Sequence, residues 1–148
     1  MKREIIPPTF FYFGIFFIIL LHFIFPFFRI ITYPYNLIGI GFVIIGVLLN
    51  TWAWLLFIKN KTTQNPFKQP NKFIKIGVYK FSRNPMYLGM LLILIGMSVL
   101  SGKLITFSIP LLFWVIINKW YVPIEEKIME KRFKKDYSKY KDDVRRWI

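Results

Sequence analysis

Four apolar segments set the strongest limit on what this 148-residue chain can fold into. The first two cover residues 8–28 and 37–58, and each has roughly 20 residues, enough for a helix to cross about 30 Å of hydrocarbon. The other two, over 86–100 and 104–120, are shorter and are separated by Ser101, Gly102 and Lys103, a turn signal. We therefore predict an all-α integral membrane protein with about four transmembrane helices, the last two forming a helical hairpin.

The composition agrees with a protein that is dissolved in lipid. The chain is 55% hydrophobic and 20% aromatic, more apolar surface than a soluble domain of this length can bury. Its length predicts a single domain over 1–148. It has no cysteine and a single histidine, His22, so we predict no metal site.

The positive charge indicates how the chain crosses the membrane. The formal net charge is +14, and the basic residues flank the apolar segments, so we expect them to meet lipid headgroups and predict no nucleic-acid partner. The segment 59–85 has many basic residues and no acid, whereas the opposite loops contain only Arg29 and Lys103. Because basic loops stay on the cytoplasmic side, we predict a protein of the cell membrane with segment 59–85 and both termini cytoplasmic.

The C-terminal residues 123–148 have the pattern of an amphipathic helix. Their apolar residues recur at steps of three and four, which predicts one apolar helix face that lies on the membrane surface or folds over the bundle. A simple electrostatic anchor is the alternative. The apolar positions are Ile124, Ile128, Met129, Phe133, Tyr137, Tyr140, Val144 and Trp147.

Two adjacent acids do not suit an anchor. Glu126 projects from the apolar face of this helix, and Glu125 borders the same stripe. Buried carboxylates at the end of a membrane helix are costly without a cationic partner. The residues leave two interpretations open, a salt bridge to a cation such as Arg83 and a site for a cationic ligand or a base.

The segment 77–89, with the sequence Gly-Val-Tyr-Lys-Phe-Ser-Arg-Asn-Pro-Met-Tyr-Leu-Gly, is the second unusual feature. An irregular polar segment at a membrane border is costly unless it lines a cavity or binds a ligand. Asn84 and Pro85 also suit the start of a helix, and Arg83 suits a lipid headgroup. These simpler explanations leave Gly77 and Gly89 unexplained.

This segment resembles the signature Gly-x-Tyr-x-x-x-Arg-His/Asn-Pro-x-Tyr-x-Gly of the isoprenylcysteine carboxyl methyltransferase and phospholipid methyltransferase families. The C-terminal part is also similar to theirs, with a Glu pair, an aromatic residue, two tyrosines three apart and Val-x-Arg. The resemblance covers residues 64–148. Its matching positions here are Gly77, Tyr79, Arg83, Asn84, Pro85, Tyr87, Gly89, Glu125, Glu126, Phe133, Tyr137, Tyr140, Val144 and Arg146.

The resemblance implies a helical membrane enzyme that uses S-adenosylmethionine to methylate a carboxylate or amine of a lipid or isoprenoid-type acceptor. Within this interpretation we expect Glu126 and Arg83 to be catalytic, with Glu126 positioning or deprotonating the acceptor. The carboxylate of the cofactor suits Arg83, Lys72 or the free N–H groups at the start of the third apolar segment. The cofactor-binding residues that the resemblance implies are Gln64, Asn71, Lys72, Phe73, Ile74, Tyr79, Asn84, Pro85, Met86, Tyr87 and Glu125.

The chain departs from the family pattern at three positions. Asn84 replaces the commoner histidine, so any role of an imidazole is lost. Lys134 stands where a glycine often follows the aromatic residue, and Tyr121 replaces the substrate-binding arginine of the prenylcysteine enzymes. Two alternatives remain at this point, an NADPH-dependent membrane reductase related to sterol reductases and a non-enzymatic membrane protein.

Overall fold

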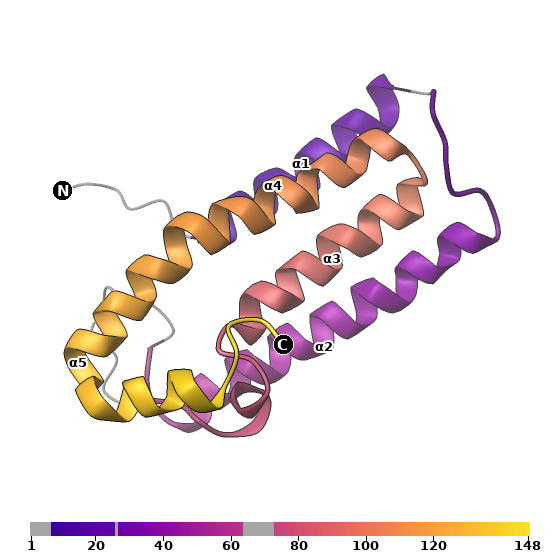
Figure 1. The fold of residues 1–148 in the computed structure, drawn as a ribbon. Coiled ribbons are helices and arrows are strands. Elements are labelled where there is room, and N and C mark those ends of the chain that lie inside the picture. Colours follow the sequence, from indigo (N-terminus) through magenta and orange to yellow (C-terminus); the bar gives the residue numbers. More distant parts are fainter. Residues whose placement is uncertain (1–6, 26, 64–72) are drawn as a thin grey trace.

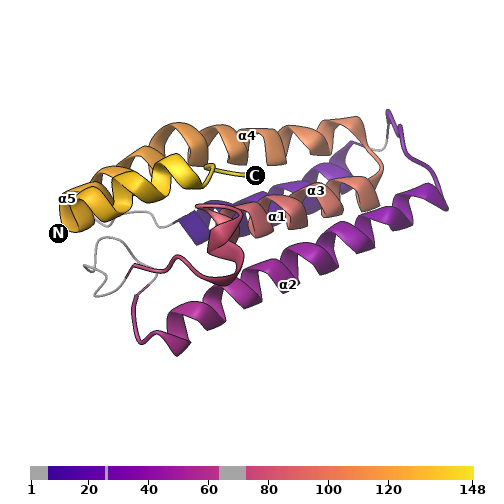
Figure 2. The ribbon, with the colours of Figure 1, turned by 60° about the horizontal axis from the view of Figure 1, so that its bottom comes forward.

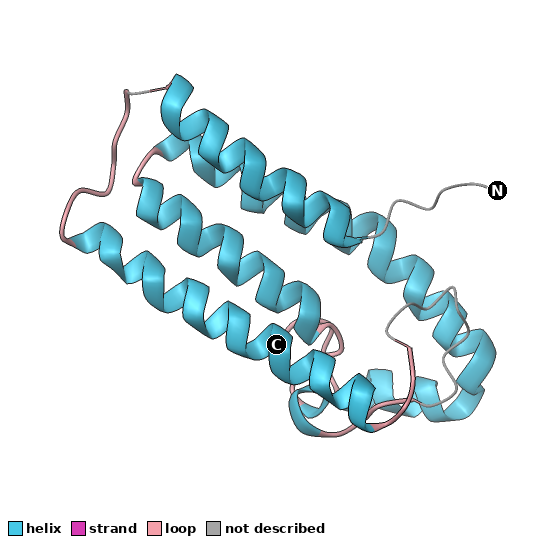
Figure 3. Ribbon diagram, turned by 180° about the vertical axis from the view of Figure 1, so that it is seen from behind, coloured by secondary structure: helices cyan, strands magenta, loops and turns pink. Residues whose placement is uncertain are grey.

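The computed structural model describes residues 7–25, 27–63 and 73–148, and this part of the chain is helical, without strands (Figures 1 and 3). The prediction of an all-α fold is confirmed. The α-helices are α1 (Pro7–Ile24), α2 (Ile38–Lys59), α3 (Pro85–Ser101), α4 (Ser108–Ile116) and α5 (Val122–Asp143). Short 3₁₀ helices lie at Tyr35–Leu37, Gly77–Lys80 and Leu104–Phe107.

Three helical runs of the described chain are long and apolar enough to cross a membrane. They are Pro7–Ile24, Tyr35–Lys59 and Leu104–Asp143. In the last run the apolar part ends near Tyr121, since the charges of α5 do not suit hydrocarbon. The fourth apolar helix, α3, has 17 residues, or about 25 Å of helix, and it packs against α1, α2 and α4 (Figure 2). The chain therefore has the helices of an integral membrane protein.

Paired glycines bring α2 and α3 into close contact. The two helices lie side by side and run in opposite directions, with Gly39 against Gly96 and Gly46 against Gly89 (Figure 1). A Cβ atom at Gly46 would lie 2.6 Å from the carbonyl oxygen of Gly89, and one at Gly89 would lie 2.8 Å from that of Gly46. Small residues let membrane helices approach this closely. Helix packing thus accounts for Gly89, which the sequence left unexplained.

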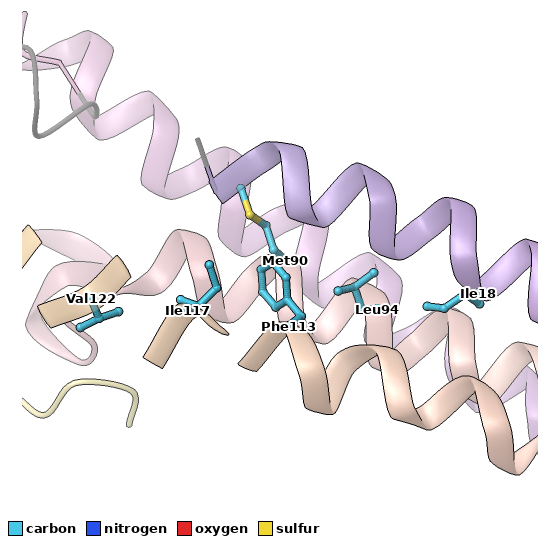
Figure 4. Packing of buried hydrophobic residues seen from close by; sticks show 6 residues of the cluster. All are labelled: Ile18, Met90, Leu94, Phe113, Ile117 and Val122. Atoms are coloured by element: carbon cyan, nitrogen blue, oxygen red, sulfur yellow. The ribbon is translucent and has the colours of Figure 1, made fainter. Parts of the chain in front are cut away.

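Buried apolar side chains fill the space between α1, α3 and the helix formed by α4 and α5. Figure 4 labels six of them, from all of these helices, and Leu94 of α3, between Phe113 and Ile18 in the row, is fully buried (Figure 4). The labelled residues are Ile18, Met90, Leu94, Phe113, Ile117 and Val122. This core fixes α3, and therefore the start of α3, relative to the helix that carries the glutamates.

The predicted hairpin between α3 and α4 turns at Gly102. This glycine has a φ of 69°, and its N–H group donates to the carbonyls of Ser98 and Val99, which is a common way to end a helix. The segments 104–120 and 123–148, which the sequence analysis treats as two elements, are continuous in the structure. A π-helical turn at Ile117–Tyr121 joins α4 to α5 without a break. It lies just before Pro123, which cannot donate a backbone hydrogen bond, and a local π-helical turn is one way in which a continuous helix accommodates this.

The predicted helix over 123–148 is wrong at its end. α5 stops at Asp143, and Val144 is extended. Within α5, Lys134 has a φ of 44° and a ψ of −120°, so the helix breaks there and its second half turns back under the bundle (Figure 1). A lysine side chain is strained in this left-handed conformation. α5 therefore folds over the end of the bundle, one of the two arrangements that its pattern predicted.

Candidate active site

The segment between α2 and α3 and the helix α5 meet at one end of the bundle (Figures 1 and 2). Gly77 begins the 3₁₀ helix of this segment with a φ of 62°, which favours glycine. A Cβ atom there would also lie 2.9 Å from Cδ1 of Leu56 on α2. Gly77 is therefore required by the turn and by its packing against α2.

Aromatic side chains hold this segment against the second half of α5. The ring of Phe73 lies 4.8 Å from that of Tyr140 and 5.3 Å from that of Tyr137, measured between centroids. The hydroxyl of Tyr140 donates to the carbonyl oxygen of Tyr79, at 2.5 Å. Tyr79 is itself buried against Leu56 of α2. These contacts bring the two sequence motifs together.

Glu126 lies between two arginines. Its Oε1 atom is 3.1 Å from NH1 of Arg83, and Arg146 binds both oxygens, with Nε at 3.2 Å from Oε1 and NH2 at 2.8 Å from Oε2. Glu126 is only 7% exposed. The sequence left two interpretations open for the acids, a salt bridge and a ligand site. For Glu126 the structure shows the salt bridge.

Arg83 has N–H groups that make no hydrogen bond to a described residue. Its side chain is 10% exposed, and within the described part of the chain its Nε and NH1 atoms have no hydrogen-bond acceptor. The NH1 atom is near Glu126, but the geometry of that contact is not that of a hydrogen bond. Buried N–H groups of a charged side chain are costly when unpaired. An anionic group of a ligand would satisfy them.

Glu125 lies in a different environment from its neighbour. Its Oε1 atom accepts a hydrogen bond from the hydroxyl of Tyr87 on α3, and it forms none of the salt bridges among the described residues. Burial raises the pKa of Glu125 to about 7, with a further increase from the charge of Glu126, whereas the hydrogen bond from Tyr87 opposes the shift. A cation beside Glu125 would relieve this cost.

The extended C-terminal residues close the site from the outside. The backbone N–H of Arg83 donates to the carbonyl of Arg145 at 3.0 Å, and the side-chain amide of Asn84 donates to the carbonyl of Arg146 at 3.0 Å. Asn84 stands at the N-cap position of α3 and Pro85 in its first turn, as the simpler explanation expected, but the Asn84 side chain makes no capping hydrogen bond. In the π-helical turn, Oδ1 of Asn118 accepts from NH1 of Arg146 at 3.3 Å and from Nε1 of Trp147 at 3.1 Å.

Comparison with known proteins agrees with this arrangement. The family model described as "Phospholipid methyltransferase" matches residues 34–136, which is most of the chain. This chain belongs to the phospholipid methyltransferase family. The resemblance drawn from the two motifs is confirmed, and the site described above lies where the two motifs of a membrane methyltransferase family meet.

Three relatives extend the comparison. An uncharacterised Haemophilus influenzae protein is 35% identical over 63 residues, which are 43% of this chain and all of that protein. Two rice proteins, from Oryza sativa subsp. indica and subsp. japonica, are named probable protein-S-isoprenylcysteine O-methyltransferase. Each is 29% identical over 110 residues, which are 72% of this chain but only 57% of the rice protein. No solved structure matches the chain significantly.

The expected site residues of this phospholipid methyltransferase family member fall into three groups in the structure. Gln64, Asn71 and Lys72 lie outside the described residues. Arg83 contacts Glu126, and Tyr87 contacts Glu125, the chain neighbour of Glu126. The side chains of the other expected residues are used in packing or in contacts within the protein, so we expect any ligand contact there to involve mainly the backbone; they are Phe73, Ile74, Tyr79, Asn84, Pro85 and Met86.

Two further residues of the site were not predicted. Arg146 belongs to the Val-x-Arg part of the family pattern, so the resemblance offered a signal for it. Asn118 is the only residue of the described protein that accepts hydrogen bonds from both Arg146 and Trp147. Its signal in the sequence is a polar side chain within an apolar membrane segment, which is costly without a partner.

Proposed function

We propose that this protein is an S-adenosylmethionine-dependent methyltransferase that transfers a methyl group to a lipid or isoprenoid-type acceptor at the cytoplasmic face of the cell membrane. The family membership supports the reaction class. The finer assignment rests on one observation: Arg83, which has guanidinium N–H groups without an acceptor among the described residues, contacts Glu126, the chain neighbour of the uncompensated carboxylate of Glu125.

This pair of groups fits the charges of the proposed cofactor. S-adenosylmethionine supplies an electrophilic methyl group on a sulfonium cation, and its amino-acid end carries an amine and a carboxylate. Glu125 supplies a negative charge for a cationic part, and Arg83 supplies N–H donors for a carboxylate. Tyr87 orients Glu125 through its hydroxyl. The burial of these groups makes each charge interaction stronger than it is in water.

We assign the two glutamates different roles. Glu126 is bound to two guanidinium groups, so its oxygens are already occupied by contacts within the protein, and of its two expected roles we favour positioning over proton removal. Glu125, whose pKa is about 7, is ionised in a large fraction of molecules at neutral pH and is available to a ligand. The remaining catalytic contribution is orientation of the two reactants, which in a displacement reaction supplies much of the rate.

The acceptor reaches this site from the membrane in our proposal. The outward faces of α1 and α2 are apolar, with exposed side chains such as Phe16 and Leu48, so a lipid beside the bundle needs no passage through water. The end of α2 and the described residues before α3 lie at the same end of the bundle as the site (Figure 1), and they contain the basic residues Lys59, Lys61, Lys75 and Lys80. This arrangement supports a cytoplasmic location for that end.

Calorimetric titration of the detergent-purified protein with S-adenosylmethionine tests the proposal. We expect saturable binding that is weakened about tenfold or more by Glu125→Gln, the loss expected for a buried interaction with a charged group. Glu130→Gln, on the same helix and paired with Lys141, is the control and should leave binding unchanged. Binding of NADPH without binding of S-adenosylmethionine would favour the reductase alternative and reject the proposal.

A further inference from the structure

We propose that Arg146, from the extended residues after α5, is a positioning residue of this site. It binds Glu126 so that Arg83 is left to bind an oxyanion group of a ligand, a carboxylate or a phosphate. This inference rests on the proposed function, and it adds a residue that acts on the ligand only through Glu126 and Arg83.

Glu126 accepts more hydrogen bonds from Arg146 than from Arg83. Arg146 makes two hydrogen bonds to the carboxylate, one to each oxygen, which is the strong two-point geometry of a guanidinium and a carboxylate. Arg83 makes one approach, of NH1 to Oε1 at 3.1 Å, without hydrogen-bond geometry. Glu126 therefore balances the charge of Arg83 without occupying its donors.

Arg146 is held in this position by contacts along its backbone and its side chain. Asn118 accepts a hydrogen bond from its NH1 atom. The carbonyl of Arg146 accepts from the side chains of Asn84, at 3.0 Å, and Ser82, at 3.5 Å. The neighbouring ring of Trp147 lies beside that of Trp114, with 6.5 Å between the centroids. These contacts fix both the backbone and the guanidinium of Arg146.

The loss of Arg146 has a specific consequence. Glu126 is buried and cannot remain without hydrogen bonds, since an unpaired buried carboxylate is costly. The N–H groups of Arg83 are the nearest alternative donors. Glu126 would then bind Arg83 at two points and occupy the donors that the ligand needs. An oxyanion ligand should therefore bind more weakly, while a ligand without that group should be affected much less.

This reasoning predicts a rescue. If Arg146→Gln acts by releasing Glu126 onto Arg83, removal of the charge of Glu126 should free Arg83 again. The double variant Arg146→Gln/Glu126→Gln should therefore bind the oxyanion ligand better than Arg146→Gln alone. A purely structural role of Arg146 predicts the opposite, because the second substitution removes a further contact.

The test uses the full chain in detergent and two pairs of probes. The first pair is S-adenosylmethionine and its decarboxylated analogue, and the second is N-acetyl-S-farnesylcysteine and its methyl ester, titrated in the presence of S-adenosylhomocysteine. We expect Arg146→Gln to weaken the acid of one pair about tenfold and its partner without the carboxylate much less. The affected pair identifies the source of the oxyanion, the cofactor or the acceptor. Arg145→Gln, an exposed neighbour with the same charge change, should have no effect.

Two results would overturn the inference. One is an equal effect of Arg146→Gln, in both pairs, on the acid and on the member without the carboxylate, and the other is no rescue in the double variant. If the unmutated protein binds S-adenosylmethionine and the variants give either result, only the role of Arg146 is wrong. If the unmutated protein binds neither acid, the proposed function and this inference are both rejected.

Discussion

The hydroxyl of Tyr87, in the first turns of α3, donates a hydrogen bond to the carboxylate of Glu125 on α5. This contact joins residues 38 positions apart in the chain, one from each of the two sequence motifs. It also gives Glu125 a neutral partner in place of a cation, so the carboxylate is oriented while its charge remains available. The site therefore differs from an ordinary buried salt bridge.

Replacing Tyr87 tests this contact directly. We expect Tyr87→Phe to weaken S-adenosylmethionine binding at neutral pH about threefold to tenfold, since a hydrogen bond to a charged group is lost. The same loss raises the pKa of Glu125 further, because the hydrogen bond from Tyr87 holds it down. Titration calorimetry measures the affinity, and Tyr12→Phe, at an exposed position of α1, is the control. An affinity unchanged at every pH would contradict the role of Tyr87.

Binding should depend on pH through Glu125. Its pKa is raised to about 7, so the carboxyl group is mostly protonated below that pH and mostly ionised above it. A cationic ligand prefers the ionised form, and we expect the affinity for S-adenosylmethionine to rise about tenfold between about pH 6 and pH 8.

The variant Glu125→Gln separates this effect from titration of the ligand itself. It has no ionisable group at that position, so its pH dependence should contain only the part due to the ligand. Identical pH profiles for the two proteins would show that Glu125 does not face the cation.

The glycine contacts between α2 and α3 should be necessary for stability. We expect Gly89→Ala to lower the free energy of unfolding by about 1–3 kcal/mol, the usual cost of an additional group in a packed interface, since its Cβ would lie 2.8 Å from the carbonyl of Gly46. Gly41→Ala is the matched control on α2, because a Cβ there would meet nothing within 4 Å. Thermal unfolding in detergent compares the two, and equal midpoints would be evidence against close packing of the helices.

A glycine at the break in α5 should stabilise the protein. Lys134 has a φ of 44°, where glycine is not strained, so we expect Lys134→Gly to stabilise the protein by about 1 kcal/mol. Lys135→Gly, one residue later in the helix, should instead destabilise it by about 1 kcal/mol. Thermal unfolding of both variants provides the measurement. A loss of stability in Lys134→Gly would show that α5 is continuous at this point.

The sequence predicted the elements well where composition alone decides them. Runs of apolar residues of membrane length have few alternatives to a helix, since backbone groups in lipid must be satisfied within the segment. The turn at Gly102 was predicted for the same kind of local reason. The family was also visible in the sequence, because the two motifs keep both their residue types and their order.

The contacts between distant segments needed the tertiary structure. The sequence placed Glu125 and Glu126 side by side and left a salt bridge and a ligand site equally open. Only the fold shows that Glu126 pairs with Arg83 and Arg146, whereas Glu125 meets the hydroxyl of Tyr87. The role of Gly89 was hidden for the same reason, since its partner Gly46 lies on another helix. Charge balance and close packing depend on distances in space, and spacing along one helix does not determine which residues of other segments come near.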